Sequence, residues 1–85
     1  MLIIDVRTPE EYAQGHLKGA ILIEYQNIMP EILKYIESKD QQIGLYCAAG
    51  ARSGFAAYVL SQNGFTNAVN LGSYLDILRQ HPELK

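Results

Sequence analysis

The 85-residue sequence contains one cysteine, no tryptophan and no surplus of basic residues. A single cysteine cannot close an intramolecular disulfide, and it supplies too few thiolates for a zinc cluster. With a net charge of -2, the chain has no excess of positive charge to hold nucleic acid or an anionic membrane surface. No apolar run approaches the roughly 18 residues of a membrane span. We therefore expect no disulfide scaffold, no metal site, and neither nucleic acid nor membrane as a partner.

What the sequence does contain is the composition of an ordinary globular domain. Hydrophobic residues make up 48% and charged residues 19% of the chain, which separates it from disordered and fibrous sequences. Because we find no repeat, linker or low-complexity tract, we expect one domain over residues 1–85. The first residues show no basic flank and no long apolar segment. The expected compartment is the periplasm if a signal peptide has been removed, and otherwise the cytoplasm.

Apolar, β-branched runs alternate with segments of helical periodicity along the chain. The expected strands are 2–6, 20–23, 42–47 and 67–71, and the expected helices are 9–13, 27–36, 53–63 and 74–79. Strands separated by helices of this length predict right-handed crossovers and a mostly parallel sheet. The sequence thus predicts a three-layer α/β domain, with a small sheet flanked by helices on both faces.

Capping signals define the ends of several of these helices. Thr8 and Pro9 are typical of a helix start, and Gly15 ends that helix. Gly64 is expected as a left-handed cap after the helix 53–63. The helix 27–36 is expected to bury a face formed by four residues at helical spacing: Ile28, Ile32, Leu33 and Ile36.

The segment most suggestive of chemistry begins at Cys47, where a predicted strand meets a predicted helix. The residues that follow are Ala48, Ala49, Gly50, Ala51, Arg52 and Ser53. Small side chains leave backbone N–H groups open, and a helix N-terminus adds unpaired donors and positive potential. Such a nest of amides lowers the pKa of a thiol and favours a nucleophilic thiolate. An isolated buried cysteine is also common as a packing residue, so these residues alone leave both roles open for Cys47.

Arg52 follows Cys47 after four intervening residues. Its guanidinium is close enough in sequence to meet an anionic substrate or to brace the loop against a nearby carboxylate. The sequence does not choose between these two roles.

Two motifs together resemble the single-domain rhodanese family of thiosulfate sulfurtransferases. Residues 4–12 (IDVRTPEEY) and 15–21 (GHLKGAI) match the first family signature in order and spacing, and residues 46–53 (YCAAGARS) match the active loop. The resemblance spans nearly the whole chain, which is most similar to the small members of the family. It implies the rhodanese fold and a persulfide carried by Cys47, with the loop residues 48–53 binding substrate.

The implied reaction moves the sulfane sulfur of thiosulfate to cyanide or a thiol. It requires no metal and no organic cofactor, and we expect a monomer that can also serve a protein sulfur acceptor. A persulfide carrier or a regulatory binding module is the alternative. A phosphatase related to the rhodaneses is less favoured, because its loop places five residues between the cysteine and the arginine.

Other residues are expected to support the architecture. Asp5 and Arg7 flank the end of the first strand, where each could pair with a neighbour of the other, and the preferred ion pair is between Arg7 and Glu11. His16 is expected to brace the turn after the first helix. Tyr58 and Tyr74 are expected as packing residues or as the rim of the pocket. The chain departs from the family pattern at residues 71–75 (LGSYL), where a Gly-Gly pair and a Trp are usual, and at Ile23-Glu24, where Ile-Pro is usual.

Overall fold

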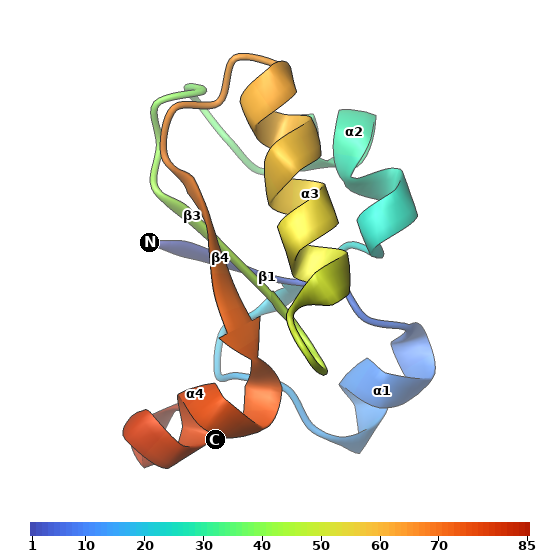
Figure 1. Ribbon diagram of the computed structural model, residues 1–85, viewed down its shortest axis with the longest axis vertical. Coiled ribbons are helices and arrows are strands. Elements are labelled where there is room, and N and C mark those ends of the chain that lie inside the picture. The colour runs from blue at the N-terminus through green and yellow to red at the C-terminus, as the bar shows by residue number, and fades with distance from the viewer.

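A computed structural model describes residues 1–85 and shows one sheet of four parallel strands (Figure 1). The strands lie in the order β2-β1-β3-β4. Their bounds are Leu2–Asp5 for β1, Ile21–Leu22 for β2, Ile43–Cys47 for β3 and Ala68–Ser73 for β4. The two central strands therefore end at Asp5 and Cys47, which places both residues at the carboxyl edge, where parallel α/β sheets bind ligands.

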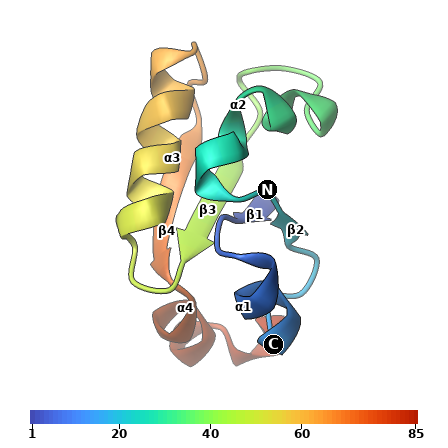
Figure 2. The same ribbon diagram turned by 90° about the vertical axis from the view of Figure 1, so that its right-hand side faces the viewer.

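Helices cover both faces of the sheet (Figures 1 and 2). Helix α3 (Ala51–Gln62) and the short helix α2 (Ile28–Glu31) lie on one face, and α4 (Tyr74–Gln80) lies on the other. Helix α1 (Pro9–Gln14) lies near the carboxyl end of the strands, and the β3–α3 loop runs between α1 and α4 in Figure 1. The three-layer α/β arrangement predicted from the sequence is confirmed.

The alternation of side chains along β3 divides the core into two clusters. Ile43, Leu45 and Cys47 point toward α3 and belong to a cluster of 11 buried residues. Tyr46 points to the opposite face, where it packs in a cluster of 3 buried residues against the partly buried side chains of α4. Cys47 therefore ends a strand on the better packed face, directly below the first turn of α3.

The caps expected from the sequence are present. The Thr8 side chain accepts a hydrogen bond from the Glu11 amide at 3.2 Å, and the Glu11 carboxylate accepts one from the Thr8 amide at 3.0 Å. This reciprocal pair satisfies two backbone donors at the start of α1. Gly15 caps α1 at its end, and Gly64 has a φ of +88°, the left-handed conformation that glycine adopts without a Cβ penalty.

The continuous helix expected over residues 27–36 is wrong. The segment consists of a 3-10 turn over Tyr25–Asn27, the short α2, and a second 3-10 turn over Ile32–Lys34. Met29 has extended backbone angles because the proline that follows disfavours the helical region for the residue before it. As a result Ile28 and Ile32 are buried, but Leu33 is 46% exposed rather than part of the core.

The remaining expected elements differ only at their ends. The strand expected over 67–71 runs on to Ser73, and the helix expected over 53–63 begins two residues earlier, at Ala51. None of the helices combines the length and the apolar character needed to cross a membrane.

Candidate active site

Cys47 lies at the junction between β3 and the loop that leads into α3. The residue is 1% exposed, whereas Ala48 and Ala49 are exposed at the surface. Residues 48–53, expected to line a substrate site, form the loop after β3 and the first turn of α3, which begins at Ala51. The thiol thus lies at the base of a loop whose outer wall consists of small side chains.

Backbone donors of this loop converge on the sulfur. The Gly50 amide donates to Cys47 Sγ at 3.0 Å, and the Ser53 amide donates to it at 3.4 Å. Gly50 has a φ of +99°, a left-handed conformation that turns the chain back over the sulfur and that L side chains rarely adopt. The small residues in the loop therefore serve a geometric purpose, because they let the chain curl tightly enough to aim its amides at Sγ.

These donors favour the thiolate form of Cys47. Burial alone raises the pKa of the thiol. The Ser53 side chain and amide, with the amides of Ala49 and Gly50, lower it, and together they outweigh burial. The pKa of Cys47 therefore lies below its ordinary value of 9.0. A cysteine surrounded in this way has the chemical character of a nucleophile.

The Ser53 hydroxyl links the sulfur to β4. Its oxygen lies 3.3 Å from Cys47 Sγ, 2.7 Å from Asn70 Oδ1 and 3.2 Å from the Gly50 carbonyl. The hydroxyl has one hydrogen for these three acceptors, so a negative charge on Sγ competes for it with the Asn70 carbonyl oxygen. Ser53 can in this way adjust to the charge of the sulfur without moving its backbone.

Asn70 is a site residue that the sequence analysis missed. Its amide nitrogen donates to the Gly50 carbonyl at 3.0 Å, and its oxygen accepts from the Gly72 amide at 3.0 Å. These bonds fix the loop against β4. Its position in the sequence could have indicated this role. Asn70 is a polar residue near the carboxyl end of a parallel strand, and such a residue lies beside the end of the neighbouring strand, here β3.

Arg52 braces the loop rather than pointing free into solvent. Its Nη1 and Nη2 atoms donate to Glu11 Oε1 at 2.8 Å and Oε2 at 3.1 Å, a two-pronged pair that joins α3 to α1. The hydrogen bonds from Arg52, followed by the one from the Thr8 amide, lower the pKa of Glu11 to about 2. Of the two roles left open for Arg52, the structure shows the contact with a carboxylate.

The expected ion pair between Arg7 and Glu11 is wrong. Arg7 pairs with Asp5 instead, with Nη2 2.7 Å from Oδ2, and both side chains are buried. Glu11 is occupied by Arg52, and Arg7 is turned inward by the end of β1, where its Nε also bonds to Asp5. The hydrogen bonds from Asp5 raise the pKa of Arg7, because they favour the charged guanidinium over the neutral form.

The Asp5–Arg7 pair extends to the strand that carries the cysteine. Tyr46 donates its hydroxyl to Asp5 Oδ2 at 2.8 Å, and the Leu17 amide donates to that hydroxyl at 3.0 Å. The network therefore connects β1, β3 and the segment before β2. It sets the relative position of the two strand ends that form the floor of the site.

The aromatic residues expected around the site have separate roles. His16 stacks on Tyr12 with ring centroids 3.6 Å apart, and its Nδ1 lies 2.9 Å from the Tyr12 carbonyl oxygen, so it braces the turn after α1. Tyr74 lies beside the loop, where it lines a pocket with Ala48. Tyr58 is 61% exposed on the surface of α3.

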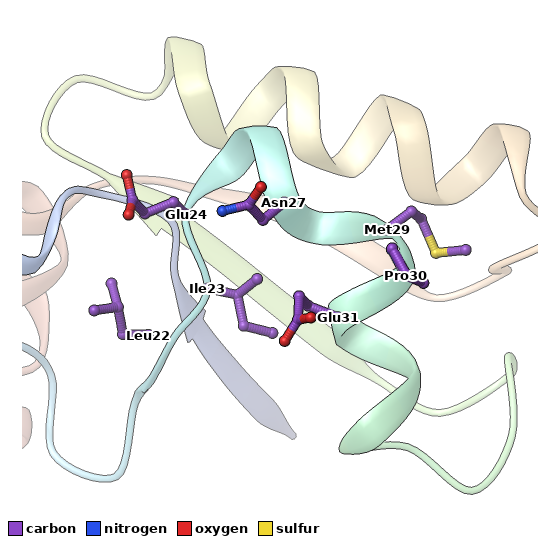
Figure 3. Close-up of a pocket in the computed structure, with 7 residues that line it drawn as sticks. All are labelled: Leu22, Ile23, Glu24, Asn27, Met29, Pro30 and Glu31. Atoms are coloured by element: carbon purple, nitrogen blue, oxygen red, sulfur yellow. The ribbon is translucent and has the colours of Figure 1, made fainter.

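The largest hollow on the surface is not at the cysteine (Figure 3). It measures about 450 Å³ and lies between the segment that follows β2 and the helical segment around α2. Its lining residues are Leu22, Ile23, Glu24, Asn27, Met29, Pro30 and Glu31. None of these is a nucleophile, and we therefore assign the chemistry to the Cys47 loop.

Comparison with known proteins agrees with this geometry. A family model described as rhodanese-like domain matches residues 1–79. The chain belongs to the rhodanese family. This rhodanese is 40% identical over 74 residues to thiosulfate sulfurtransferase PspE of Escherichia coli, an alignment that covers 87% of this chain and 71% of that protein. It is 37% identical over 71 residues to a sulfurtransferase of Allochromatium vinosum, covering 84% of this chain and 64% of that one.

A solved structure shows the same fold. A rhodanese from E. coli, described as containing anions, superposes on this rhodanese with a TM-score of 0.85 and 39% identity over 88% of each chain. Together these similarities place this rhodanese in the sulfurtransferase class of enzymes. The family membership expected from the two sequence motifs is confirmed.

Proposed function

We propose that this rhodanese is a thiosulfate sulfurtransferase that works through a persulfide on Cys47. The observation that carries the proposal is the set of polar groups around Sγ: the Gly50 amide donates at 3.0 Å, the Ser53 amide donates at 3.4 Å, and the Ser53 hydroxyl oxygen lies 3.3 Å away. A thiol surrounded in this way ionises more readily, and the thiolate is the form that attacks sulfur. The thiosulfate sulfurtransferase name of the E. coli relative supports the choice of donor.

In the first half-reaction the Cys47 thiolate attacks the outer sulfur of thiosulfate. A bond forms between Sγ and that sulfur, the S–S bond of thiosulfate breaks, and sulfite leaves with the bonding electron pair. The negative charge that began on Sγ ends on the outer sulfur of the persulfide. Amides in the first turn of α3 have no acceptor within the helix and can stabilise this charge, as an oxyanion hole does in acyl transfer.

In the second half-reaction an acceptor takes the outer sulfur. A thiol attacks it, the Sγ–S bond breaks, Cys47 is released as the thiolate, and the proton of the thiol passes to the new persulfide. Cyanide gives thiocyanate by the same displacement and needs no proton. The scheme is a double displacement with a covalent intermediate, for which ping-pong kinetics are expected.

The small side chains of the loop suit this chemistry. Cys47 is 1% exposed, and the exposed residues that follow it at the mouth of the loop are Ala48 and Ala49. Methyl groups leave more room at that mouth than longer side chains would. The acceptor is accordingly expected to be a small thiol, or a thiol presented on a narrow segment of a protein.

The test is mass spectrometry after treatment with thiosulfate, together with turnover of thiosulfate and cyanide. We expect the protein to gain one sulfur, about 32 Da, which cyanide removes and which the Cys47→Ser variant does not acquire. The interpretation is simple because the chain has no second cysteine. An adduct without turnover would indicate a persulfide carrier, and no adduct at all would contradict the proposed function.

A further inference from the structure

A second pocket lies directly beside the Cys47 loop. It measures about 310 Å³, and Ala48, the residue after the cysteine, forms part of its wall. Arg7, Gln14 and Tyr74 also line it, as does the exposed Leu75. The sulfur transfer described above uses none of these side chains. The pocket is therefore placed to hold the part of a substrate that does not react.

The guanidinium of Arg7 has one nitrogen to spare in this pocket. The residue is only 6% exposed, and its Nε and Nη2 atoms are bonded to Asp5 and to the Gly15 carbonyl oxygen, the latter at 2.6 Å. Nη1 has no hydrogen-bond partner in the protein. Every fully buried side-chain nitrogen in the protein has a hydrogen-bond partner. Since Nη1 has none, it is not fully buried and solvent reaches it. This pocket is where Arg7 contacts solvent.

The surroundings hold this nitrogen in a fixed position. The central carbon of the guanidinium lies 4.6 Å from the centroid of the Tyr74 ring and 5.6 Å from that of the Tyr46 ring. The Asp5 carboxylate accepts hydrogen bonds from Nε and Nη2 of the same guanidinium. A donor held so firmly loses little conformational entropy when it binds an acceptor. Two N–H groups on one nitrogen fit oxygen atoms of a carboxylate or a sulfonate.

The charges around the pocket cancel in pairs. Glu11 lines the same pocket, but its carboxylate is paired with Arg52, and Arg7 is itself paired with Asp5. An anionic group is therefore recognised here by hydrogen bonds rather than by net positive potential. Gln14, on the exposed last turn of α1, is the neutral lining residue at which a charge can be introduced with little effect on packing.

We propose that this pocket binds the oxyanion group of the small molecule that exchanges sulfur with Cys47, and that Arg7 Nη1 donates to it. The inference rests on the sulfurtransferase activity proposed above. The oxyanion has two sources with the same chemistry, the sulfonate end of thiosulfate and the carboxylate of an acidic thiol acceptor. Ping-pong kinetics separate them, since kcat/KM for the donor and for the acceptor report different half-reactions.

The experiment changes the charge at Gln14 rather than Arg7, because removing Arg7 would leave Asp5 buried without its partner. Gln14→Glu and Gln14→Lys are compared with Gln62→Glu and Gln62→Lys, which place the same charges at the far end of α3. The acceptors are 3-mercaptopropionate and the neutral 2-mercaptoethanol. Thiosulfate is the donor throughout.

If the acceptor supplies the oxyanion, Gln14→Glu lowers kcat/KM for 3-mercaptopropionate about fivefold relative to 2-mercaptoethanol, and Gln14→Lys raises it by a similar factor. If thiosulfate supplies it, kcat/KM for thiosulfate changes instead and the two thiols stay equal. Responses at Gln14 that match those at Gln62 in every arm would overturn the inference while leaving the sulfurtransferase activity intact. Absence of transfer in the unmodified protein would overturn the proposed function, and this inference with it.

Discussion

The ion pair between Glu11 and Arg52 gives the most quantitative prediction. It joins α1 to the first turn of α3, and the two side chains are 32% and 30% exposed. Lowering the pKa of Glu11 from 4.5 to about 2 corresponds to about 3 kcal/mol of folding free energy. Part of the shift comes from the Thr8 amide, and solvent screens the partly exposed pair, so the share of the Arg52 pair is about 1–2 kcal/mol. The pair should therefore be a measurable part of the stability of the domain.

The perturbation is Glu11→Gln. Glutamine keeps an oxygen that can accept from the Thr8 amide, so the capping box survives while the charge facing Arg52 is lost. Urea unfolding at neutral pH should show a loss of about 1–2 kcal/mol. Glu37→Gln is the control, because Glu37 is exposed and its carboxylate forms no ion pair. It should leave the free energy of unfolding nearly unchanged.

The pH dependence tests the reasoning more severely. Because the folded pKa of Glu11 lies below its unfolded value, the stabilisation is fully present above pH 4.5 and is lost as the pH falls toward 2. The difference in stability between the unmodified protein and Glu11→Gln should shrink across that interval. A difference that stays constant with pH would refute the electrostatic account of this pair.

Two further predictions concern the neighbours of Cys47. Ser53→Ala removes a hydroxyl that lowers the pKa of Cys47, so alkylation by iodoacetamide at neutral pH should slow, whereas Ser61→Ala at the far end of the same helix should not change the rate. An equal rate in both variants would show that the hydroxyl does not act on the sulfur. Tyr46→Phe removes the hydroxyl donated to Asp5 and leaves a buried backbone amide without its acceptor, which should cost about 1–3 kcal/mol in urea unfolding. A loss below the error of the fit would show that the network adds nothing to stability.

Local signals in the sequence were sufficient for the caps and for the active loop. Thr8, Gly15 and Gly64 act through their own backbone neighbourhoods, which a short window of sequence contains. The nest of amides after Cys47 was predictable for the same reason, since small residues before a helix N-terminus leave backbone N–H groups open to a negative charge.

Partners distant in the chain were not predictable in this way. Arg7 and Glu11 are four residues apart, the spacing of a helical ion pair, but Arg7 lies before α1 and folds back on Asp5. The partner of Glu11 comes from 41 residues further along, where the tertiary fold brings α3 to α1. The break in the helix expected over 27–36 did have a local signal, because Pro30 disfavours a helical backbone at Met29. The apolar periodicity of the segment was given more weight than this proline.

The central claim is that the donors of the loop lower the pKa of Cys47 and so favour its thiolate form. Its most direct test is a pH titration of the ultraviolet absorbance of the thiolate in the unmodified protein, which reports one group because the chain has one cysteine. The structure predicts a midpoint below 9.0. A midpoint at or above that value would show that burial outweighs the donors, and it would contradict the mechanism.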